Sequence, residues 1–171
     1  MAGRTDVFDL ASLGLSPGEA RKLDLDVEVE PLALGEERYV PSAPRVPVRL
    51  EVARLAGGYA LRLRFGAALE GPCMRCLEAG AAAVDVNAQE VHRPAGEDPE
   101  LRSPYVSGDE LDLRAWARDA LVLDLPPQIL CREECLGLCA TCGTPMNEDP
   151  EHAHEAAPDP RWAKLSELRL E

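Results

Sequence analysis

Apolar and polar residues alternate strictly along several stretches of the first ninety residues. The alternation runs through 23–30, 46–52 and 59–69, and more weakly through 81–91. A period of two sends successive side chains to opposite faces of an extended chain, so each stretch predicts a strand with one buried and one solvated face. A glycine pair at 57–58 separates the second stretch from the third and predicts a hairpin.

The pattern changes near residue 110. Residues 92–110 show no period and predict a long loop. Asp112 then predicts the N-cap of a helix over 113–124, and the proline pair at 126–127 predicts its end. The apolar stripe of this helix, which we expect to pack in the core, consists of Leu113, Trp116, Ala117, Ala120 and Leu121.

Together these elements predict an α+β fold class: mainly an antiparallel β sheet or a partly open barrel, with a few helices and a Cys-rich zinc-binding C-terminal segment. We expect residues 1–130 to form a β-rich domain with one helix. Residues 131–171 are predicted to form the Cys-rich metal-binding segment, with a short C-terminal helix packed on it that begins at Asp159 and Pro160.

The chain has 171 residues, enough to bury a core without disulfides, yet six of these residues are cysteines. The first residues contain no apolar run of signal-peptide length, and no stretch approaches the roughly 20 apolar residues of a membrane span. We therefore expect a cytoplasmic protein without a membrane partner, in which thiols stay reduced. Under these conditions the cysteines indicate a metal ion rather than disulfides.

The spacing of the cysteines is typical of zinc ligands. Each Cys-X-X-Cys turn brings two sulfurs close enough to bind one tetrahedral ion, and two such turns occur far apart in the chain. A further pair of cysteines, four residues apart, can share one face of a helical turn. The predicted ligands of one or two Zn²⁺ ions are Cys73, Cys76, Cys131, Cys135, Cys139 and Cys142.

Two arrangements of these ligands are open. In the first, the 73–76 pair joins two of the four later cysteines in a single site. In the second, the four cysteines from 73 to 135 form one site, and the last two recruit histidines into another. Those additional candidate ligands are His152 and His154, although histidines in an acidic linker are more often simply solvated.

Enzymatic functions find little support in the motifs. Residues 72–76 match the PCxxC half of the zinc-deaminase signature, but no His or Cys precedes Cys73, so the other half is absent. A thiol redox enzyme would need its Cys-X-X-Cys motif at the start of a helix in a βαβ unit, whereas this motif follows a predicted strand. We therefore expect a protein that is not an enzyme and has no small-molecule substrate, in which the metal holds the C-terminal segment on the β domain.

The charge distribution is uneven. The net charge is −13, but residues 41–80 contain six Arg against three Glu, or +3, which leaves −16 for the remainder. A hairpin turn at 57–58 predicts that Arg49 lies opposite Arg64, with Arg62 near Glu51. This face predicts backbone contact with RNA, and the alternative is a solvated face with one ion pair. The candidate RNA-binding residues are Arg45, Arg49, Arg62, Arg64 and Arg75.

Several motifs together resemble one family, the YceD-like large ribosomal RNA subunit accumulation proteins. They are FDLASLGLSPGEA (8–20), CMRCLE (73–78), the block 109–131, CREECLGLCATCG (131–143), MNED (146–149) and DPRWAKLSEL (159–168). Many members have Cys-X-Cys shortly after the Asn-Glu stretch, where this chain has His152 and His154.

The resemblance implies a role in the synthesis, processing or accumulation of large-subunit ribosomal RNA, and it supplies no catalytic residues. We expect a metal-stabilised, non-enzymatic factor of ribosome biogenesis, whose partners are large-subunit ribosomal RNA, ribosomal proteins or assembly factors. The alternative is an acidic protein-binding module that escorts a basic ribosomal protein without contacting RNA.

Overall fold

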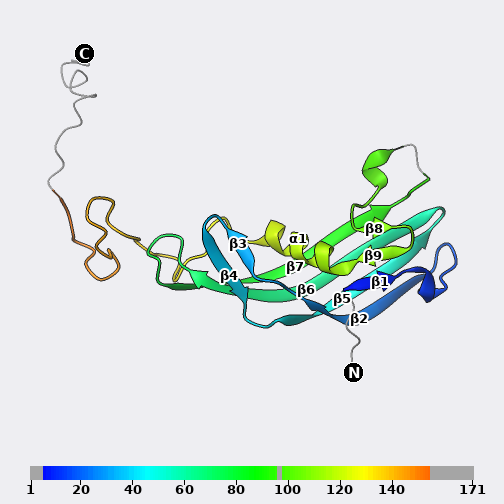
Figure 1. The fold of residues 1–171 in the computed structure, drawn as a ribbon, viewed down its shortest axis with the longest axis horizontal. Coiled ribbons are helices and arrows are strands. Elements are labelled where there is room, and N and C mark those ends of the chain that lie inside the picture. Colours follow the sequence, from blue (N-terminus) through cyan, green and yellow to red (C-terminus); the bar gives the residue numbers. More distant parts are fainter. Residues whose placement is uncertain (1–5, 96–97, 155–171) are drawn as a thin grey trace, which may run out of the picture.

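The computed structural model of the chain describes residues 6–95 and 98–154. Its framework is an antiparallel sheet built on three long strands (Figure 1). Strands β5 (Arg45–Leu55) and β6 (Gly58–Pro72) form the predicted hairpin, and β7 (Ala79–His92) pairs with β6 along its whole length. Gly57, with a φ of 88°, provides the turn conformation that the hairpin needs.

Shorter strands extend this sheet on the other side of β6. Strand β2 (Ala20–Glu28) pairs with β5. Where β5 diverges from β6, β4 (Glu37–Pro41) takes its place, and β3 (Leu32–Leu34) pairs with β4. Among the described residues, β7 pairs with neither β2 nor β3, the strands at the other edge, so the sheet is open. The predicted, mainly antiparallel sheet is confirmed, and an open edge is compatible with the partly open barrel that the sequence also allowed.

A second, three-stranded sheet has the order β1-β9-β8. It is formed by β1 (Val7–Asp9), β8 (Val106–Ser107) and β9 (Glu110–Asp112), and two 3₁₀ turns, η1 (Ala11–Leu13) and η2 (Pro99–Leu101), lie near it in sequence. The prediction of an unbroken loop over 92–110 was wrong, because η2, β8 and the first residue of β9 fall within it. Strands of two or three residues are too short to produce a recognisable alternation.

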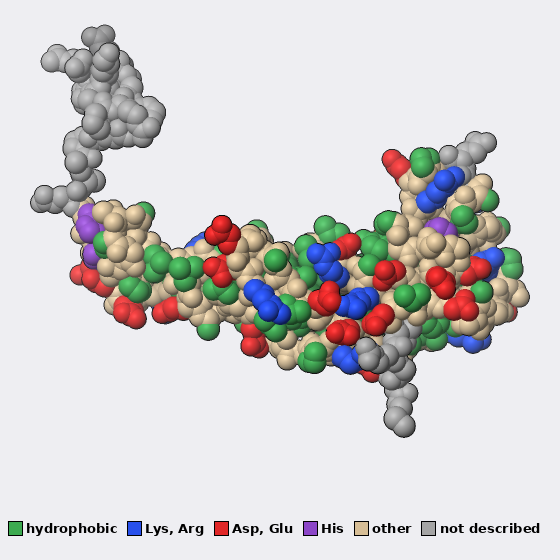
Figure 2. Space-filling view, viewed as in Figure 1, with side chains coloured by type: hydrophobic (Ala, Val, Ile, Leu, Met, Phe, Trp, Pro, Cys, Tyr) green, Lys and Arg blue, Asp and Glu red, His purple; other side chains and the backbone are tan. Residues whose placement is uncertain are grey.

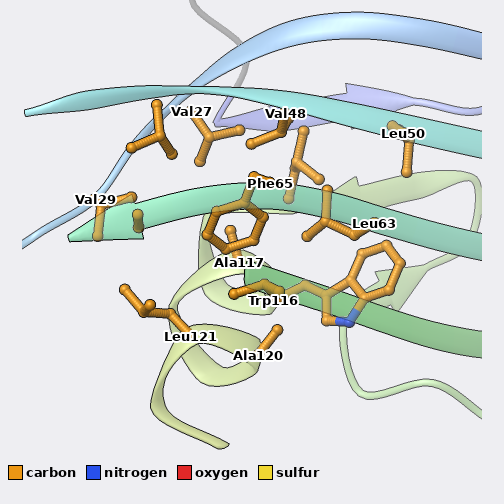
Figure 3. Close-up of a cluster of buried hydrophobic side chains, with 14 of the residues drawn as sticks. Val27, Val29, Val48, Leu50, Leu63, Phe65, Trp116, Ala117, Ala120 and Leu121 are labelled. Atoms are coloured by element: carbon orange, nitrogen blue, oxygen red, sulfur yellow. The ribbon is translucent and has the colours of Figure 1, made fainter. Parts of the chain in front are cut away.

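Helix α1 (Leu113–Asp124) confirms the predicted boundaries. The Asp112 carboxylate accepts a hydrogen bond from the Ala115 backbone N–H at 2.9 Å, which is the expected N-cap. All five residues of the predicted apolar stripe are buried. Figure 3 shows Trp116, Ala117, Ala120 and Leu121 in one cluster with side chains of β2, β5 and β6.

The same helix contacts both β2 and β7, strands at opposite edges of the curved sheet. It is the single α-helix of the described residues, where the sequence predicted a few helices. The predicted helix at Asp159 lies outside the described residues. No helix in the described ranges is long and apolar enough to cross a membrane.

The Cys-rich residues 131–154 extend from the end of the sheet at which β6 and β7 are connected (Figure 1). This placement brings Cys131 and Cys135, at the start of the segment, to the turn that carries Cys73 and Cys76. The division into domains at residue 130 stays a prediction.

Candidate metal centres

The connection between β6 and β7 is a tight turn that carries the first Cys-X-X-Cys pair. The Cys73 backbone N–H donates to the Glu78 carbonyl at 2.6 Å, and the Leu77 N–H donates to the Cys73 carbonyl at 3.0 Å. Leu77 has a φ of 64° and is the one non-glycine residue with positive φ in the described part of the chain. This left-handed residue turns the chain back toward the sheet, so that both thiols point to the same side.

The second Cys-X-X-Cys pair has the same local geometry. The Gly143 N–H donates to the Cys139 carbonyl at 2.8 Å, and Gly143 has a φ of 75°. Leu77 and Gly143 therefore occupy equivalent positions, each directly after the second cysteine of its pair. Glycine accepts this conformation without strain, whereas a leucine there costs about 1–2 kcal/mol.

Four thiols meet at the first turn, and we call them the inner group: Cys73, Cys76, Cys131 and Cys135. Their sulfurs all lie within 4.8 Å of one another. The Cys73 and Cys135 Sγ atoms are 3.7 Å apart, and the Cys76 and Cys131 Sγ atoms are 3.5 Å apart. A tetrahedral zinc ion with Zn–S bonds of about 2.3 Å needs sulfurs about 3.8 Å apart, so the donor set and its spacing fit Zn²⁺.

The backbone after α1 delivers the later cysteines to this group. The Met74 N–H donates to the Ile129 carbonyl at 2.9 Å, which fixes the chain just before Cys131. At Gly80, a Cβ atom would lie 3.1–3.2 Å from Leu130 and Cys73 backbone atoms. Only glycine lets the two segments approach this closely without displacement. The side chains of Cys73, Cys76 and Cys135 are buried as a result.

The remaining candidate ligands form a second set, the outer group: Cys139, Cys142, His152 and His154. Their donor atoms also lie within 4.8 Å of one another. Cys142 Sγ lies 3.1 Å from both His152 Nε2 and His154 Nε2, and the two Nε2 atoms are 3.0 Å apart. Two thiols and two imidazoles are a common zinc donor set. This group is more exposed than the inner one, and Figure 2 shows histidine side chains at the surface of this end of the molecule.

Of the two arrangements predicted from the sequence, the structure brings the ligands together as in the second. The six cysteines are free thiols, divided four and two between the groups. The histidines, which the sequence pattern suggested were more often solvated than ligands, complete the outer group. Binding of zinc itself stays a prediction.

Close packing of the thiols perturbs their titration. Burial raises the pKa of the Cys73 thiol, but hydrogen bonds from the backbone N–H groups of Arg75, Cys76 and Cys131 outweigh it and lower this pKa to about 6. Burial and the neighbouring sulfurs raise the pKa of Cys76 to about 12. The four thiols therefore do not ionise together readily, and a bound divalent cation would stabilise all four thiolates.

The outer group titrates in a similar way. Hydrogen bonds from the Thr144 hydroxyl and backbone lower the pKa of Cys142 to about 6, and the contact with the Cys142 thiol raises the pKa of His152. The Asp149 carboxylate lies 3.9 Å from His152 Nδ1, on the side of the ring away from the group. A carboxylate behind a histidine ligand is a frequent feature of zinc sites.

Two polar side chains that the sequence did not indicate as ligand supports surround the inner group. Arg75 donates from Nη1 to the Cys135 carbonyl and from Nε to Gln128 Oε1, both at 3.0 Å. The Asn147 amide donates to Cys135 Sγ at 3.4 Å, and this contact is the main cause that lowers the pKa of Cys135. Asn147 lies in the MNED stretch, which was the only sequence signal for it.

The candidate RNA-binding arginines lie in two places. Arg75 is at the inner group, as just described. The other four are on the sheet, where Arg49 lies opposite Arg64 and Arg62 opposite Glu51, as predicted. Contact with RNA stays a prediction for all of them.

Acidic and polar residues of neighbouring strands occupy this face as well. Arg49 forms an ion pair with Asp24 of β2 at 2.9 Å, and Glu51 lies 3.8 Å from Arg64 and 3.6 Å from Lys22. Arg62 donates to Asn87 of β7 at 2.9 Å, so the cross-strand ion pair of Glu51 is with Arg64 rather than with Arg62. Arg45 donates to the Asp26 carbonyl at 2.8 Å. The sheet face is thus a mixed-charge surface rather than a basic patch.

A known protein family matches the part of the chain that contains the candidate metal ligands. The family model described as "Large ribosomal RNA subunit accumulation protein YceD" matches residues 61–169, a range that contains both metal-ligand groups. The chain belongs to the YceD family. The resemblance found in the sequence motifs is thereby confirmed.

Similar chains occur in mycobacteria. Uncharacterized proteins of Mycobacterium tuberculosis and Mycobacterium bovis are each 32% identical to this chain over 166 residues, covering 94% of it and 79% of their own length. An uncharacterized protein of Mycobacterium leprae is 28% identical over 180 residues, covering 95% of this chain and 76% of its own. No solved structure matches this chain.

Proposed function

We propose that this chain is a non-enzymatic, zinc-stabilised factor in the processing and accumulation of large-subunit ribosomal RNA, and so in ribosome biogenesis. The observation that carries this proposal is the match to the YceD family model over residues 61–169. The matched range includes the Cys-X-X-Cys turn at residues 73–77 and the described part of the Cys-rich segment, so the candidate metal ligands lie within the region that the family model covers.

The metal would have a structural role. Four protein ligands per ion complete a tetrahedral site and leave no position for a substrate, which is the property of structural rather than catalytic zinc. Bound zinc would neutralise thiolates that otherwise repel one another. The ligands Cys73 and Cys76 sit on the β6–β7 connection, and Cys131 and Cys135 follow α1, so one ion would join the Cys-rich segment to the sheet.

The proposed test is genetic and biochemical. Depletion of the protein in its host should lower mature large-subunit ribosomal RNA relative to small-subunit RNA, and wild-type protein should restore the ratio. A Cys76→Ser variant should fail to restore it, whereas Ser107→Ala, a substitution at an exposed position of β8 away from both groups, should succeed. An unchanged RNA ratio on depletion would refute the proposal.

A second function is favoured by the charges. The arginines of the sheet are interspersed with Asp24, Glu51 and other acids, and residues 131–154 carry one Arg against five acidic residues. Such surfaces suit a basic protein better than RNA phosphates. In this alternative the chain is an acidic module that escorts a basic ribosomal protein without touching RNA.

Purification of the tagged protein with and without nuclease separates the two. A ribosomal protein that stays bound after nuclease treatment favours the escort function. Direct RNA contact instead predicts binding of a large-subunit RNA fragment that weakens with salt and is lost when Arg49, Arg62 and Arg64 are changed to Glu.

A further inference from the structure

The inner and outer groups are connected by a short two-stranded element. Residues 136–139 run antiparallel to 144–147: the Met146 N–H donates to the Gly137 carbonyl at 3.0 Å, and the Cys139 N–H donates to the Thr144 carbonyl at 2.9 Å. Leu138 and Pro145 form an isolated bridge between the two segments. One end of this element leads to Cys135 and the other to the second Cys-X-X-Cys turn.

Asn147 touches the inner group from this element. Its Nδ2 donates to Cys135 Sγ at 3.4 Å, and its Oδ1 accepts the Leu136 N–H at 2.9 Å. The orientation of the amide follows from chemistry, because the Leu136 N–H can only donate and the side-chain oxygen must face it. The side chain therefore directs an N–H group at the sulfur of a predicted ligand.

The loop that carries Asn147 begins and ends at ligands of the outer group. Asn147 lies midway between Cys142 and His152, which are both outer ligands. An ion bound to these ligands would close the loop 142–152 and remove conformations in which Asn147 is turned away from Cys135. Among the described residues of this loop, Asn147 is the one whose side chain donates a hydrogen bond to an inner-group sulfur.

We propose that Asn147 couples the two metal sites, so that an ion at the outer group increases the affinity of the inner group for its own ion. The inference rests on the metal binding in the proposed function. It assigns the outer group a task, since its ion would order the residue that supports a ligand of the inner site. By reciprocity, an ion at the inner group also tightens binding at the outer group.

The magnitude follows from two general observations. Removal of a residue that supports a metal ligand lowers affinity roughly 10–100-fold. Coupling between two sites in one protein is typically about 5–150-fold. We therefore expect Asn147→Ala to weaken the inner site about tenfold or more, and loss of the outer ligands to weaken it about fivefold or more.

The experiment uses the full-length chain and Co²⁺ as the probe, because its absorption bands distinguish four thiolate ligands from two thiolates and two imidazoles. Inner-site affinity is measured by competition with a chelator in wild type, Asn147→Ala, His152→Ala/His154→Ala and the combined variant. Asn147→Asp is a second perturbation that keeps the acceptor for Leu136 but removes the donor to sulfur. Asn87→Ala, an asparagine on the sheet, is the matched control.

Coupling through Asn147 predicts that the histidine substitutions weaken the inner site in wild type but change it less than about twofold once Asn147 is absent. The coupling is overturned if the histidine substitutions leave the inner-site affinity unchanged. It is also overturned if they lower that affinity by the same factor with and without Asn147. Two independent ions would leave the metal-binding proposal standing and overturn the coupling alone. A chain that takes up no ion at the inner group overturns both.

Discussion

Gly80 provides a direct test of how the Cys-rich segment is held on the sheet. In Gly80→Ala, the new Cβ atom would lie 3.1 Å from the Leu130 carbonyl carbon, and 3.2 Å from both the Leu130 oxygen and the Cys73 Cα. Ordinary contacts between carbon atoms are about 3.5–4.0 Å, so the segments must separate by a few tenths of an ångström. All three neighbours are backbone atoms, of the ligand Cys73 or of Leu130 next to Cys131, and no side chain can rotate away.

Overpacking of this kind costs about 1–3 kcal/mol. Because the strain falls between the segments that carry Cys73 and Cys131, we expect it mainly in metal affinity. A loss of about 1.4 kcal/mol corresponds to tenfold weaker zinc binding at the inner group. Chelator competition measures this affinity, and urea unfolding of the metal-loaded and metal-free protein measures the effect on the sheet.

Gly66→Ala is the matched control for this substitution. Its Cβ would lie 3.3 Å from the Asp85 carboxylate, a side chain at the surface that can move, so zinc affinity should equal that of wild type. If Gly80→Ala binds zinc as tightly as Gly66→Ala and unfolds at the same urea concentration, the close approach does not hold the segment, and the reasoning fails.

Three further predictions concern single residues. In metal-free protein the exposed Cys142 thiol, with its pKa of about 6, should react with iodoacetamide at a rate that rises with pH through about 6 and levels off by neutral pH. The rate for an ordinary thiol keeps rising toward pH 9, so a Cys142 rate that still climbs steeply above pH 8 would contradict the assignment. Bound zinc should suppress the reaction. Leu77→Gly should leave the free energy of unfolding in urea within about 1 kcal/mol of wild type, because relief of the left-handed leucine offsets the added freedom of glycine in the unfolded chain. Gly143→Leu should weaken metal binding at the outer group, because it places a leucine in the same left-handed conformation. A Gly143→Leu chain that binds metal at the outer group as tightly as wild type would be evidence against equivalent turns. Asp112→Ala removes the N-cap of α1 and should lower the free energy of unfolding by about 1 kcal/mol, measured by urea denaturation, and an unchanged midpoint would show that the cap does not contribute.

The parts of the fold that the sequence predicted are those with long regular patterns. Strands β5, β6 and β7 and helix α1 each bury a periodic set of side chains, and even the pairing of Arg49 with Arg64 followed from the turn at Gly57. Strands β1, β3, β4, β8 and β9 have two to five residues and bury at most two side chains each, which is too few to define a period.

For the candidate site, spacing identified the ligands but not their partition or their supports. The number of ions depends on which sulfurs meet, and this is set by tertiary contacts such as the approach of Leu130 to Gly80. The engagement of Arg75 with the Cys135 carbonyl also depends on residues sixty positions apart. Likewise, the ion pairs of the arginine face required the location of β2 beside β5, which strand alternation alone does not provide.

The inner group joins parts of the chain that are made at different times. Residues 77–130, which include β7, β9 and α1, lie between its two pairs of ligands. An ion held there would close a loop of this length and restrict the unfolded chain much as a disulfide does, by about 4 kcal/mol. Cys73 and Cys76 could complete the site only after Cys131 and Cys135 have been synthesised and α1 has packed on the sheet. Completion of this centre would therefore require that β7, β9 and α1 have all been synthesised and that α1 has packed on the sheet.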